Sequence, residues 1–224
     1  MNIIKKIINN LFDFPNTVLF NFKAFPIKIA LKLPVKVHRS VKIGKIPKGS
    51  IVINSDKLVS RMVLLGYKGA GFISTAHSTV NILGSGKIIF NRNCVIAEGF
   101  NIHCDNGELI FGSDFYANRN MTIQCENRIE FGKDNLVGWN VCVRDTDGHS
   151  VSRNNETNYQ ERNVFFKDHV WIASDCTILK GTNIEKDCVI GCNSLLCGLK
   201  VIEQGCLVVG VPAIVKRKGV CWEK

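Results

Sequence analysis

Apolar residues recur every six positions between Phe166 and Ala213. The blocks of six open on Phe166, Ile172, Ile178, Ile184, Ile190, Leu196, Ile202 and Val208. A period of six differs from the 3.6 of an α-helix and from the simple alternation of a strand. It indicates a β-helix, in which three short strands form one coil and the coils stack. The fifth residue of a block, which should also face inward, is small or apolar at Val170, Cys176, Cys188, Ser194 and Cys206.

The period extends back to residue 90 if earlier coils carry two or three extra residues at one corner, near residues 106–108 and 127–128. Stacking the block openings then predicts three inward columns. They read Phe90, Phe111, Phe131, Phe166, Ile184, Ile202; then Ile96, Ala117, Val137, Ile172, Ile190, Val208; then Ile102, Ile123, Val143, Ile178, Leu196, Ile214. The phenylalanine column is the most informative, because like side chains stacked at coil spacing, roughly 4.8 Å, form a solenoid core.

The continuous repeat from about residue 80 to 214 predicts one principal all-β domain. We expect an N-terminal extension at 1–40, a parallel β-helix at 41–217 with a protruding loop at 150–163, and a tail at 218–224. Residues 41–89 alternate less regularly and are expected to form irregular early coils.

The first residues predict a short basic helix. Ile3, Ile4, Ile7, Ile8 and Leu11 fall on one helical face, with lysines and asparagines on the other. We prefer a helix docked on its own protein, but a basic interfacial helix resting on an anionic membrane also fits. Prolines at 15, 26 and 34 are expected to break any longer helix.

The net charge of +10 suits solubility, an anionic small ligand or an anionic membrane surface. Lysines and arginines do not cluster with aromatics, which argues against nucleic acid as a partner. Four of the ten cysteines, Cys94, Cys176, Cys188 and Cys206, occupy inward fifth positions, where Cys is a small apolar filler. Without a CxxC pair, a secretory signal or an apolar run long enough to span a bilayer, we expect reduced thiols in a cytoplasmic protein.

The repeat breaks after Val143. The chain reads RDTDGH and then SVSRNNETNYQERNV before the hexads resume at Phe166. A polar loop leaving a regular solenoid is a common place for binding and catalysis. His149 lies at its root, and a histidine suits general-base work on a hydroxyl because its ordinary pKa is near neutrality. Asp145 or Asp147 could orient its ring or contact an acceptor.

The stretch FYANRNMTIQCENRIEFGKDNLVGWNVCVRDTDGH, with HVWIASDCTILKGTNIEKDCVIGCNSL and VVGVPAIVKR further on, resembles the hexapeptide-repeat acetyltransferases. It is most similar to the galactoside and maltose O-acetyltransferases and to the capsule and O-antigen O-acetyltransferases. The resemblance covers residues 80–217. It implies a left-handed parallel β-helix, acetyl-CoA as acyl donor, a sugar or glycan acceptor in polysaccharide biosynthesis, no metal, and a homotrimer with active sites between chains.

The resemblance also implies roles for single residues. His149 matches the catalytic base, and Asn118 of the FYAN motif matches the asparagine that holds the acceptor or the developing oxyanion. Trp171 matches the tryptophan that walls the acyl end of the cofactor cleft. Positions matching the pantetheine and phosphate contacts of acetyl-CoA are Ser174, Cys192, Lys216 and Arg217. The implied mechanism is direct transfer without a covalent nucleophile.

Asn118 and His149 fall at different corners of the predicted prism. Neighbouring corners are separated by about five extended residues, roughly 16 Å. Both side chains could then reach one reacting group only across a subunit boundary, as in a threefold oligomer.

Other functions stay open at this point. N-acetylation of an amino-sugar nucleotide and acylation of serine use the same fold. A γ-type carbonic anhydrase shares the β-helix but needs three histidines on zinc, and the five here show no close pair at ligand spacing. A non-catalytic β-helix is the third class. The basic N-terminus also leaves open that the protein acts at the inner face of the membrane.

Overall fold

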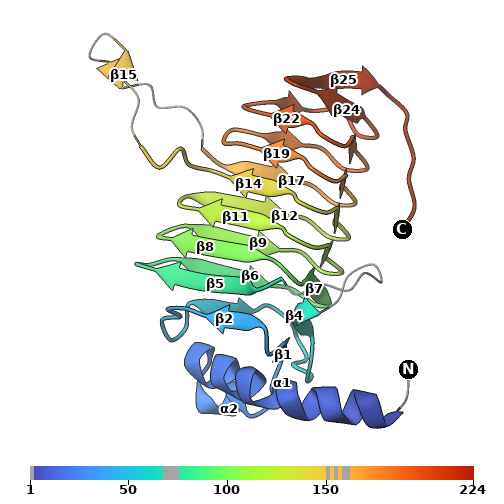
Figure 1. Ribbon diagram of the computed structural model, residues 1–224. Coiled ribbons are helices and arrows are strands. Elements are labelled where there is room, and N and C mark those ends of the chain that lie inside the picture. The colour runs from blue at the N-terminus through green and yellow to red at the C-terminus, as the bar shows by residue number, and fades with distance from the viewer. Residues whose placement is uncertain (1–2, 68–75, 150–151, 154–155, 158–161) are drawn as a thin grey trace.

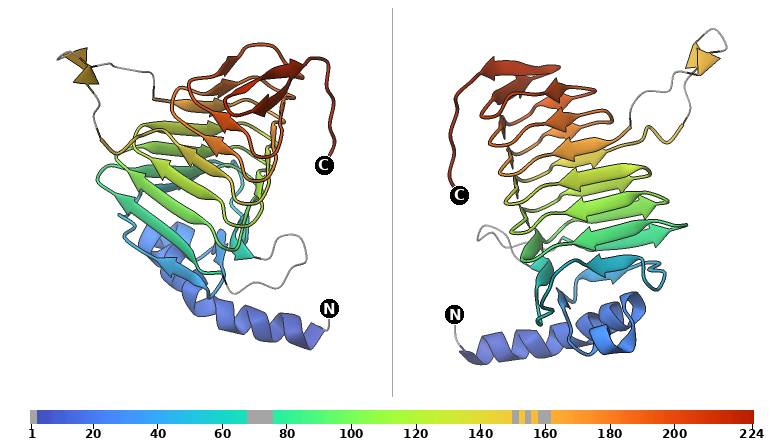
Figure 2. Two further views of the ribbon diagram at one scale, coloured as in Figure 1. Left: turned by 45° about the horizontal axis from the view of Figure 1, so that its top comes forward. Right: turned by 180° about the vertical axis from the view of Figure 1, so that it is seen from behind.

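The chain winds as a left-handed parallel β-helix of three sheets, so the predicted all-β fold class is confirmed (Figure 1). The computed structural model describes residues 3–67, 76–149, 152–153, 156–157 and 162–224. Each coil contributes one strand to each sheet in turn, and the coils stack from the N-terminal helices to the C-terminus (Figures 1 and 2).

In the described part of the chain, the first sheet, sheet A, has nine strands. They are β1 (Val35–Val37), β4 (Val63–Tyr67), β7 (Cys94–Ala97), β10 (Tyr116–Ala117), β13 (Leu136–Val137), β18 (Trp171–Ile172), β21 (Val189–Ile190), β24 (Leu207–Gly210) and β25 (Ala213–Arg217). All pairs are parallel except β24 with β25, which closes the C-terminal end as an antiparallel hairpin.

Sheets B and C have seven strands each within the same described residues. Sheet B holds β2 (Val41–Ile43), β5 (Ser78–Leu83), β8 (Asn101–Asp105), β11 (Thr122–Cys125), β14 (Cys142–Arg144), β19 (Thr177–Ile178) and β22 (Leu195–Leu196). Sheet C holds β3 (Ile51–Ile53), β6 (Lys87–Phe90), β9 (Glu108–Phe111), β12 (Arg128–Phe131), β17 (Val164–Phe166), β20 (Asn183–Ile184) and β23 (Lys200–Val201).

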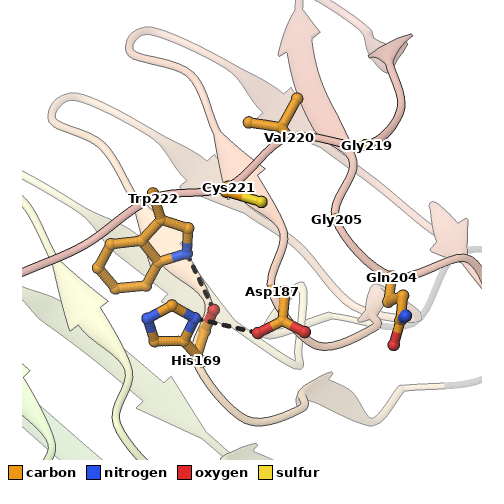
Figure 3. Close-up of a pocket in the computed structure, with 8 residues that line it drawn as sticks. All are labelled: His169, Asp187, Gln204, Gly205, Gly219, Val220, Cys221 and Trp222. Atoms are coloured by element: carbon orange, nitrogen blue, oxygen red, sulfur yellow. Dashed lines mark hydrogen bonds and ion pairs between the residues drawn. The ribbon is translucent and has the colours of Figure 1, made fainter.

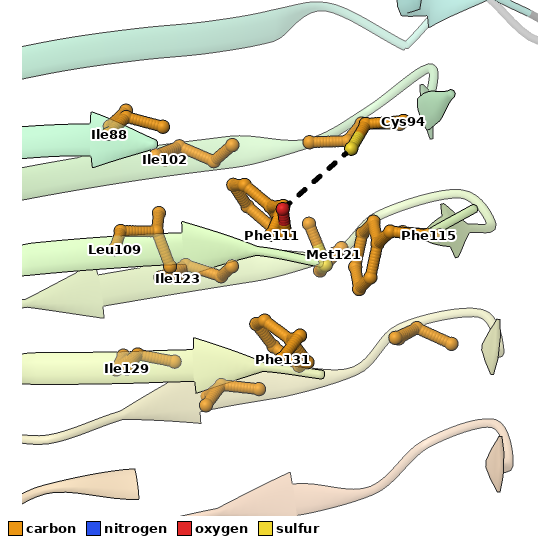
Figure 4. Packing of buried hydrophobic residues seen from close by; sticks show 14 of the residues in the cluster. Ile88, Cys94, Ile102, Leu109, Phe111, Phe115, Met121, Ile123, Ile129 and Phe131 are labelled. Atoms are coloured by element: carbon orange, nitrogen blue, oxygen red, sulfur yellow. Dashed lines mark hydrogen bonds between the residues drawn. The ribbon is translucent and has the colours of Figure 1, made fainter. Parts of the chain in front are cut away.

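The predicted phenylalanine column is the core of sheet C. Phe90, Phe111, Phe131 and Phe166 are paired in register through β6, β9, β12 and β17. Successive rings stack nearly parallel with centroids 5.1, 5.6 and 5.0 Å apart. Figure 4 shows part of this ladder among the aliphatic side chains of the interior. The prediction that the fifth residue of each block faces inward is also confirmed. The five residues named for it are all buried: Val170, Cys176, Cys188, Ser194 and Cys206.

Two predicted column members are wrong, both near the C-terminus. Val201, not Ile202, pairs with Ile184, and Ile202 is 87% exposed. The coil turns one residue early because the segment from Leu196 to Val201 is one residue shorter than the equivalent segment from Ile178 to Ile184 in the coil before. Ile214 is exposed because the chain reverses into β25 there instead of continuing the coil.

Asn and Asp at the corners explain how the chain turns so often. Positive φ values recur at equivalent corner positions, where short polar side chains tolerate the left-handed conformation. They also bond along the stack: the Asn120 side chain donates to Asn140, and the Asn140 side chain donates to Asp175, both at 2.9 Å.

The N-terminal helix is longer than predicted. α1 runs from Ile3 to Ala24 through Pro15, so the expected break at Pro15 is wrong, whereas Pro26 does separate α1 from α2 (Ile27–Ala30). Pro15 is exposed. The carbonyl that its missing N–H would have bonded can therefore be hydrated, which lowers the cost of a helical proline.

The face of α1 that meets the solenoid is polar as well as apolar. Thr17 exchanges hydrogen bonds with the backbone of Val37, at 3.1 and 3.2 Å, and Asn21 does the same with Val35, at 2.6 and 3.2 Å. β1 is the terminal strand of sheet A, so its outer backbone groups would otherwise lack partners. The helix therefore caps the open end of the β-helix.

The segment that interrupts the repeat contributes a small hairpin. β15 (Ser152–Arg153) pairs antiparallel with β16 (Glu156–Thr157), outside the three sheets. Figure 1 shows it away from the stacked coils.

Candidate functional site

His149 lies where the chain leaves sheet B after β14. The turn that leads to it is held by Thr146, whose hydroxyl donates to Glu126 at 2.7 Å and accepts from the amide of Gly148 at 3.0 Å. Glu126 belongs to the preceding coil, so stacking of two coils fixes the backbone just before the histidine.

A small polar cavity surrounds this turn. Its volume is about 150 Å³, and it is lined by Glu126, Thr146, Asp147, Gly148, His149, Arg162 and Lys180. The His149 side chain is exposed and so is accessible to a ligand. The cavity presents hydroxyl, carboxylate, guanidinium and ammonium groups, a lining suited to a polar molecule with several hydroxyls.

The two aspartates proposed to orient His149 have other described partners. Buried Asp145 accepts hydrogen bonds from the amides of Glu126 and Asn127, at 2.7 and 2.8 Å. Asp147 forms an ion pair with Lys180 at 2.5 Å. Asp145 therefore anchors the corner of the previous coil, and Asp147 contributes a paired charge to the cavity.

Burial raises the pKa of Asp145 above its usual value near 3.8, against the lowering effect of the two amide hydrogen bonds. In the unfolded chain the carboxyl has its ordinary pKa, so just above that value the folded state binds more protons. The contribution of Asp145 to stability is therefore largest in acid and falls as the pH rises through its folded pKa. We expect the urea midpoint of the wild type, relative to Asp145→Asn, to fall as the pH rises above about 4. A pH-independent difference would contradict this.

Asn118 follows β10 at the corner between sheets A and B. It is half-buried, its amide donates to the carbonyl of Val137, and its side-chain oxygen accepts from the amide of Arg119 at 3.0 Å. Arg119 forms a nearly buried ion pair with Glu98 at 2.6 Å. Sequence reasoning missed this pair, which lies directly beside Asn118.

Asn118 and His149 lie beyond opposite ends of two neighbouring strands of sheet B. Asn118 precedes β11, whereas His149 follows β14, the neighbouring strand in that sheet. The two residues therefore lie at different corners of one chain, which is where the sequence analysis expects them.

Ser174 and Cys192 lie at the same corner as Asn118, in the coils above it. Register places Ala117, Ile172 and Ile190 in one column, with these residues just beyond. The Ser174 hydroxyl accepts from the amide of Trp139 at 3.1 Å, and Cys192 is exposed. Trp171 begins β18 and is 36% exposed. Lys216 and Arg217 are exposed on β25, with Arg217 opposite Leu207 at the other end of the sheet A strands.

The C-terminal tail forms a second cavity that sequence reasoning missed. Trp222 stacks on His169 with ring centroids 4.1 Å apart, and its indole N–H donates to the carbonyl of His169 at 3.0 Å (Figure 3). His169 in turn bonds Asp187 at 3.0 Å. The cavity beside them is about 410 Å³. Trp222 also lies 5.9 Å from Trp171, so the tail extends the aromatic surface near the predicted cofactor cleft.

Comparison with known proteins adds to this geometry. No family model matches the chain. The chain is 33% identical over 130 residues to a galactoside O-acetyltransferase of Lactococcus lactis, covering 57% of this chain and 61% of that protein. It is 24% identical over 148 residues to a putative lipopolysaccharide biosynthesis O-acetyl transferase of Escherichia coli, covering 61% and 74%. It is also 28% identical over 108 residues to a polysialic acid O-acetyltransferase of Neisseria meningitidis, covering 46% and 50%.

Several of the sequence relatives of this chain are named as O-acetyltransferases of sugars or polysaccharides. The chain spans about three fifths of the length of the galactoside O-acetyltransferases it matches. Among solved structures, the polysialic-acid-specific acetyltransferase NeuO aligns over 90% of this chain and 83% of its own, with a TM-score of 0.43 and 16% identity. The resemblance stated from the sequence motifs is thus confirmed.

Proposed function

We propose that this protein is an acetyl-CoA-dependent O-acetyltransferase that acts on a sugar hydroxyl in the biosynthesis of a surface polysaccharide. The observation that carries the proposal is its kinship with sugar O-acetyltransferases. The position of His149, exposed in a polar cavity at the break in the coils, agrees with it. As part of the same proposal the enzyme works in the cytoplasm, where its ten cysteines stay reduced.

In the proposed reaction, His149 removes the proton from the acceptor hydroxyl as its oxygen attacks the thioester carbonyl of acetyl-CoA. The tetrahedral intermediate carries its negative charge on the former carbonyl oxygen, where Asn118 or backbone amides stabilise it. The intermediate then collapses, the C–S bond breaks, and the proton on His149 passes to the departing thiolate. The products are the sugar acetyl ester and free CoA.

Two of the buried cysteines, Cys94 and Cys188, are poor candidates for a covalent step. Burial raises the pKa of Cys94 to about 12 and that of Cys188 to about 11, which keeps both as inert thiols at neutral pH. Direct transfer needs no such nucleophile, because holding donor and acceptor together supplies the proximity.

The donor is proposed to lie along the corner that carries Ser174 and Cys192, with Trp171 at its acyl end. The backbone groups at this corner run in one column parallel to the stack, which suits an extended pantetheine arm. Lys216 and Arg217 would meet the nucleotide phosphates. Both side chains are exposed, and their cationic groups can form charge-assisted hydrogen bonds with an anionic group.

The proposal is tested by the release of free CoA thiol from acetyl-CoA across a panel of acceptors. The panel contains free sugars, sugar nucleotides, an amino-sugar nucleotide, serine and short polysaccharide fragments. We expect release that depends on a glycan acceptor. Release with serine or only with an amino group would favour the other transferase classes, and failure to bind acetyl-CoA would contradict the proposal.

We further propose that the enzyme is a homotrimer with each active site between two chains. The placement of Asn118 before β11 and of His149 after the neighbouring strand β14, at opposite strand ends, supports this arrangement. In a closed ring of three, the corner at one end of the sheet B strands can face the corner at the other end of these strands in the neighbouring chain.

A further inference from the structure

The outer face of α1 is apolar where an ordinary surface helix would be polar. Its exposed side chains are between 43% and 67% accessible, and they are Ile8, Leu11, Phe12, Phe14, Leu19 and Phe22. The opposite face is buried against the first coil and carries the polar residues Asp13, Thr17 and Asn21 beside the apolar Phe20 and Ala24. The helix therefore carries apolar side chains on both faces, unlike a normal amphipathic surface helix, whose apolar stripe faces the core and whose outer face is polar.

The polar residues of the inner face help to explain why α1 stays attached with its apolar outer side exposed. Thr17 and Asn21 pair with the edge of β1, and Asp13 accepts from the amide of Arg39 at 3.1 Å. These bonds anchor one face, so the apolar face cannot turn inward without leaving the β1 edge unpaired. The exposed apolar side chains of α2 and its end, Ile27 and Leu31, continue this surface at the same end of the solenoid.

Positive charge is concentrated at the same end of the chain. Residues 1–54 contain ten lysines and arginines and a single acidic residue, Asp13, whereas residues 55–224 contain nineteen basic and eighteen acidic residues. Almost all of the net charge of +10 thus belongs to the first quarter of the chain. Asp13 is 1% exposed, so its charge is directed at the protein rather than outward.

We infer that the α1–α2 surface, defined by the outer side chains of α1 and α2 with Lys23, Lys28 and Lys32, docks on an anionic lipid bilayer. An anionic bilayer binds a helix whose apolar side chains insert at the headgroup boundary and whose flanking lysines contact the anionic headgroups. Figures 1 and 2 show α1 and α2 lying across the base of the solenoid, at the end opposite β24 and β25. A helix in this position can lie flat on a membrane with the coils rising away from it.

Charge decides between a bilayer and a second copy of the chain. Two copies meeting through this surface would bring like charges together, which disfavours association. An anionic bilayer instead neutralises the lysines while it covers the apolar side chains. Within the described residues no helix is long and apolar enough to cross a membrane, so the contact we infer is a surface contact.

Flotation with vesicles tests this inference on the intact protein. Wild type is mixed with vesicles of zwitterionic lipid alone and with vesicles containing 30% anionic lipid, at low and high salt. We expect binding to the anionic vesicles that weakens with salt, because the lysine contribution is screened. The variant Leu11→Gln/Leu19→Gln/Phe22→Gln, which keeps good helix formers and the inner face, is expected to lose at least tenfold in partition.

A charge variant and its matched control complete the design. Lys28→Glu/Lys32→Glu is expected to lose more than tenfold in binding to anionic vesicles, since each basic residue contributes roughly fivefold. Lys167→Glu/Lys186→Glu makes the same charge change at exposed positions in the later coils and should bind nearly as wild type does. Melting temperatures of all variants verify folding.

Three results would overturn the inference. They are the absence of wild-type binding to anionic vesicles, equal binding by the glutamine variant, and equal losses for the two charge variants. Light scattering on the same samples tests the alternative that a second copy of the chain covers this surface. If the glutamine variant has a smaller mass than wild type and the vesicles make no difference, the surface joins copies of this chain.

Discussion

Replacing His149 with Ala is expected to lower acceptor-dependent release of CoA by about 10²–10⁴-fold, the usual contribution of a general base. Without the imidazole, the acceptor hydroxyl must attack while still protonated, and the departing thiolate has no positioned acid. The His149 side chain is exposed, and the turn before it is held by Thr146 and Glu126. Removing the ring should therefore leave the fold intact.

The measurement is the initial rate of thiol release over a range of acetyl-CoA concentrations up to saturation, with the wild type and the variant compared at the same acceptor concentration. We expect kcat to fall while the KM for acetyl-CoA changes little, because the base acts only in the transition state. His77→Ala, an exposed histidine in the early coils, serves as the matched control and should keep wild-type rates. Retention of more than a tenth of the activity by His149→Ala would remove His149 from the proposed mechanism.

Most of the fold could be predicted from the sequence because the inward positions of a β-helix follow from the local sequence of each short strand. Two inward positions in every six residues are set by the strands themselves, so Phe90 to Leu196 could be assigned to columns without knowing distant contacts. The assignment failed at Ile202 and Ile214, where a shortened coil and a hairpin end the repeat. The prediction that Pro15 breaks the helix was also wrong. The low helix propensity of proline does not take into account the hydrogen bonds by which Thr17 and Asn21 anchor the opposite face of α1 to β1.

The candidate site was readable only in part. His149 stood out because it lies at the root of a polar interruption. The partners of Asp145 did not, since the amides it binds belong to the previous coil and depend on stacking register. Trp222 gave only a weak signal, a tryptophan in a short polar tail, and its contact with His169 spans 53 positions of the chain. A repeat in the sequence predicts which residues of each strand face inward, but it does not predict contacts between distant segments of the chain.

Mixing two inactive variants is expected to restore activity if each site takes His149 from one chain and Asn118 from its neighbour. His149→Ala lacks the base, and Asn118→Ala lacks an oxyanion donor, whose loss costs about 10²–10³-fold. In randomly assembled trimers of equal parts, about a quarter of the interfaces combine an intact His149 with an intact Asn118. Co-expressed and co-purified mixtures should thus show about a quarter of wild-type activity.

The mixing experiment discriminates sharply because sites within one chain predict no restoration at all. A mixture of wild type with the double variant His149→Ala/Asn118→Ala supplies the control. Sites between chains leave about a quarter of the activity, whereas sites within a chain leave about half. Asn118 and His149 lie beyond opposite ends of neighbouring strands of sheet B, and about five extended residues between two corners span roughly 16 Å. A single acceptor hydroxyl and its developing oxyanion are separated by only a few ångströms, so the two residues can serve one reaction only when a second chain closes that gap.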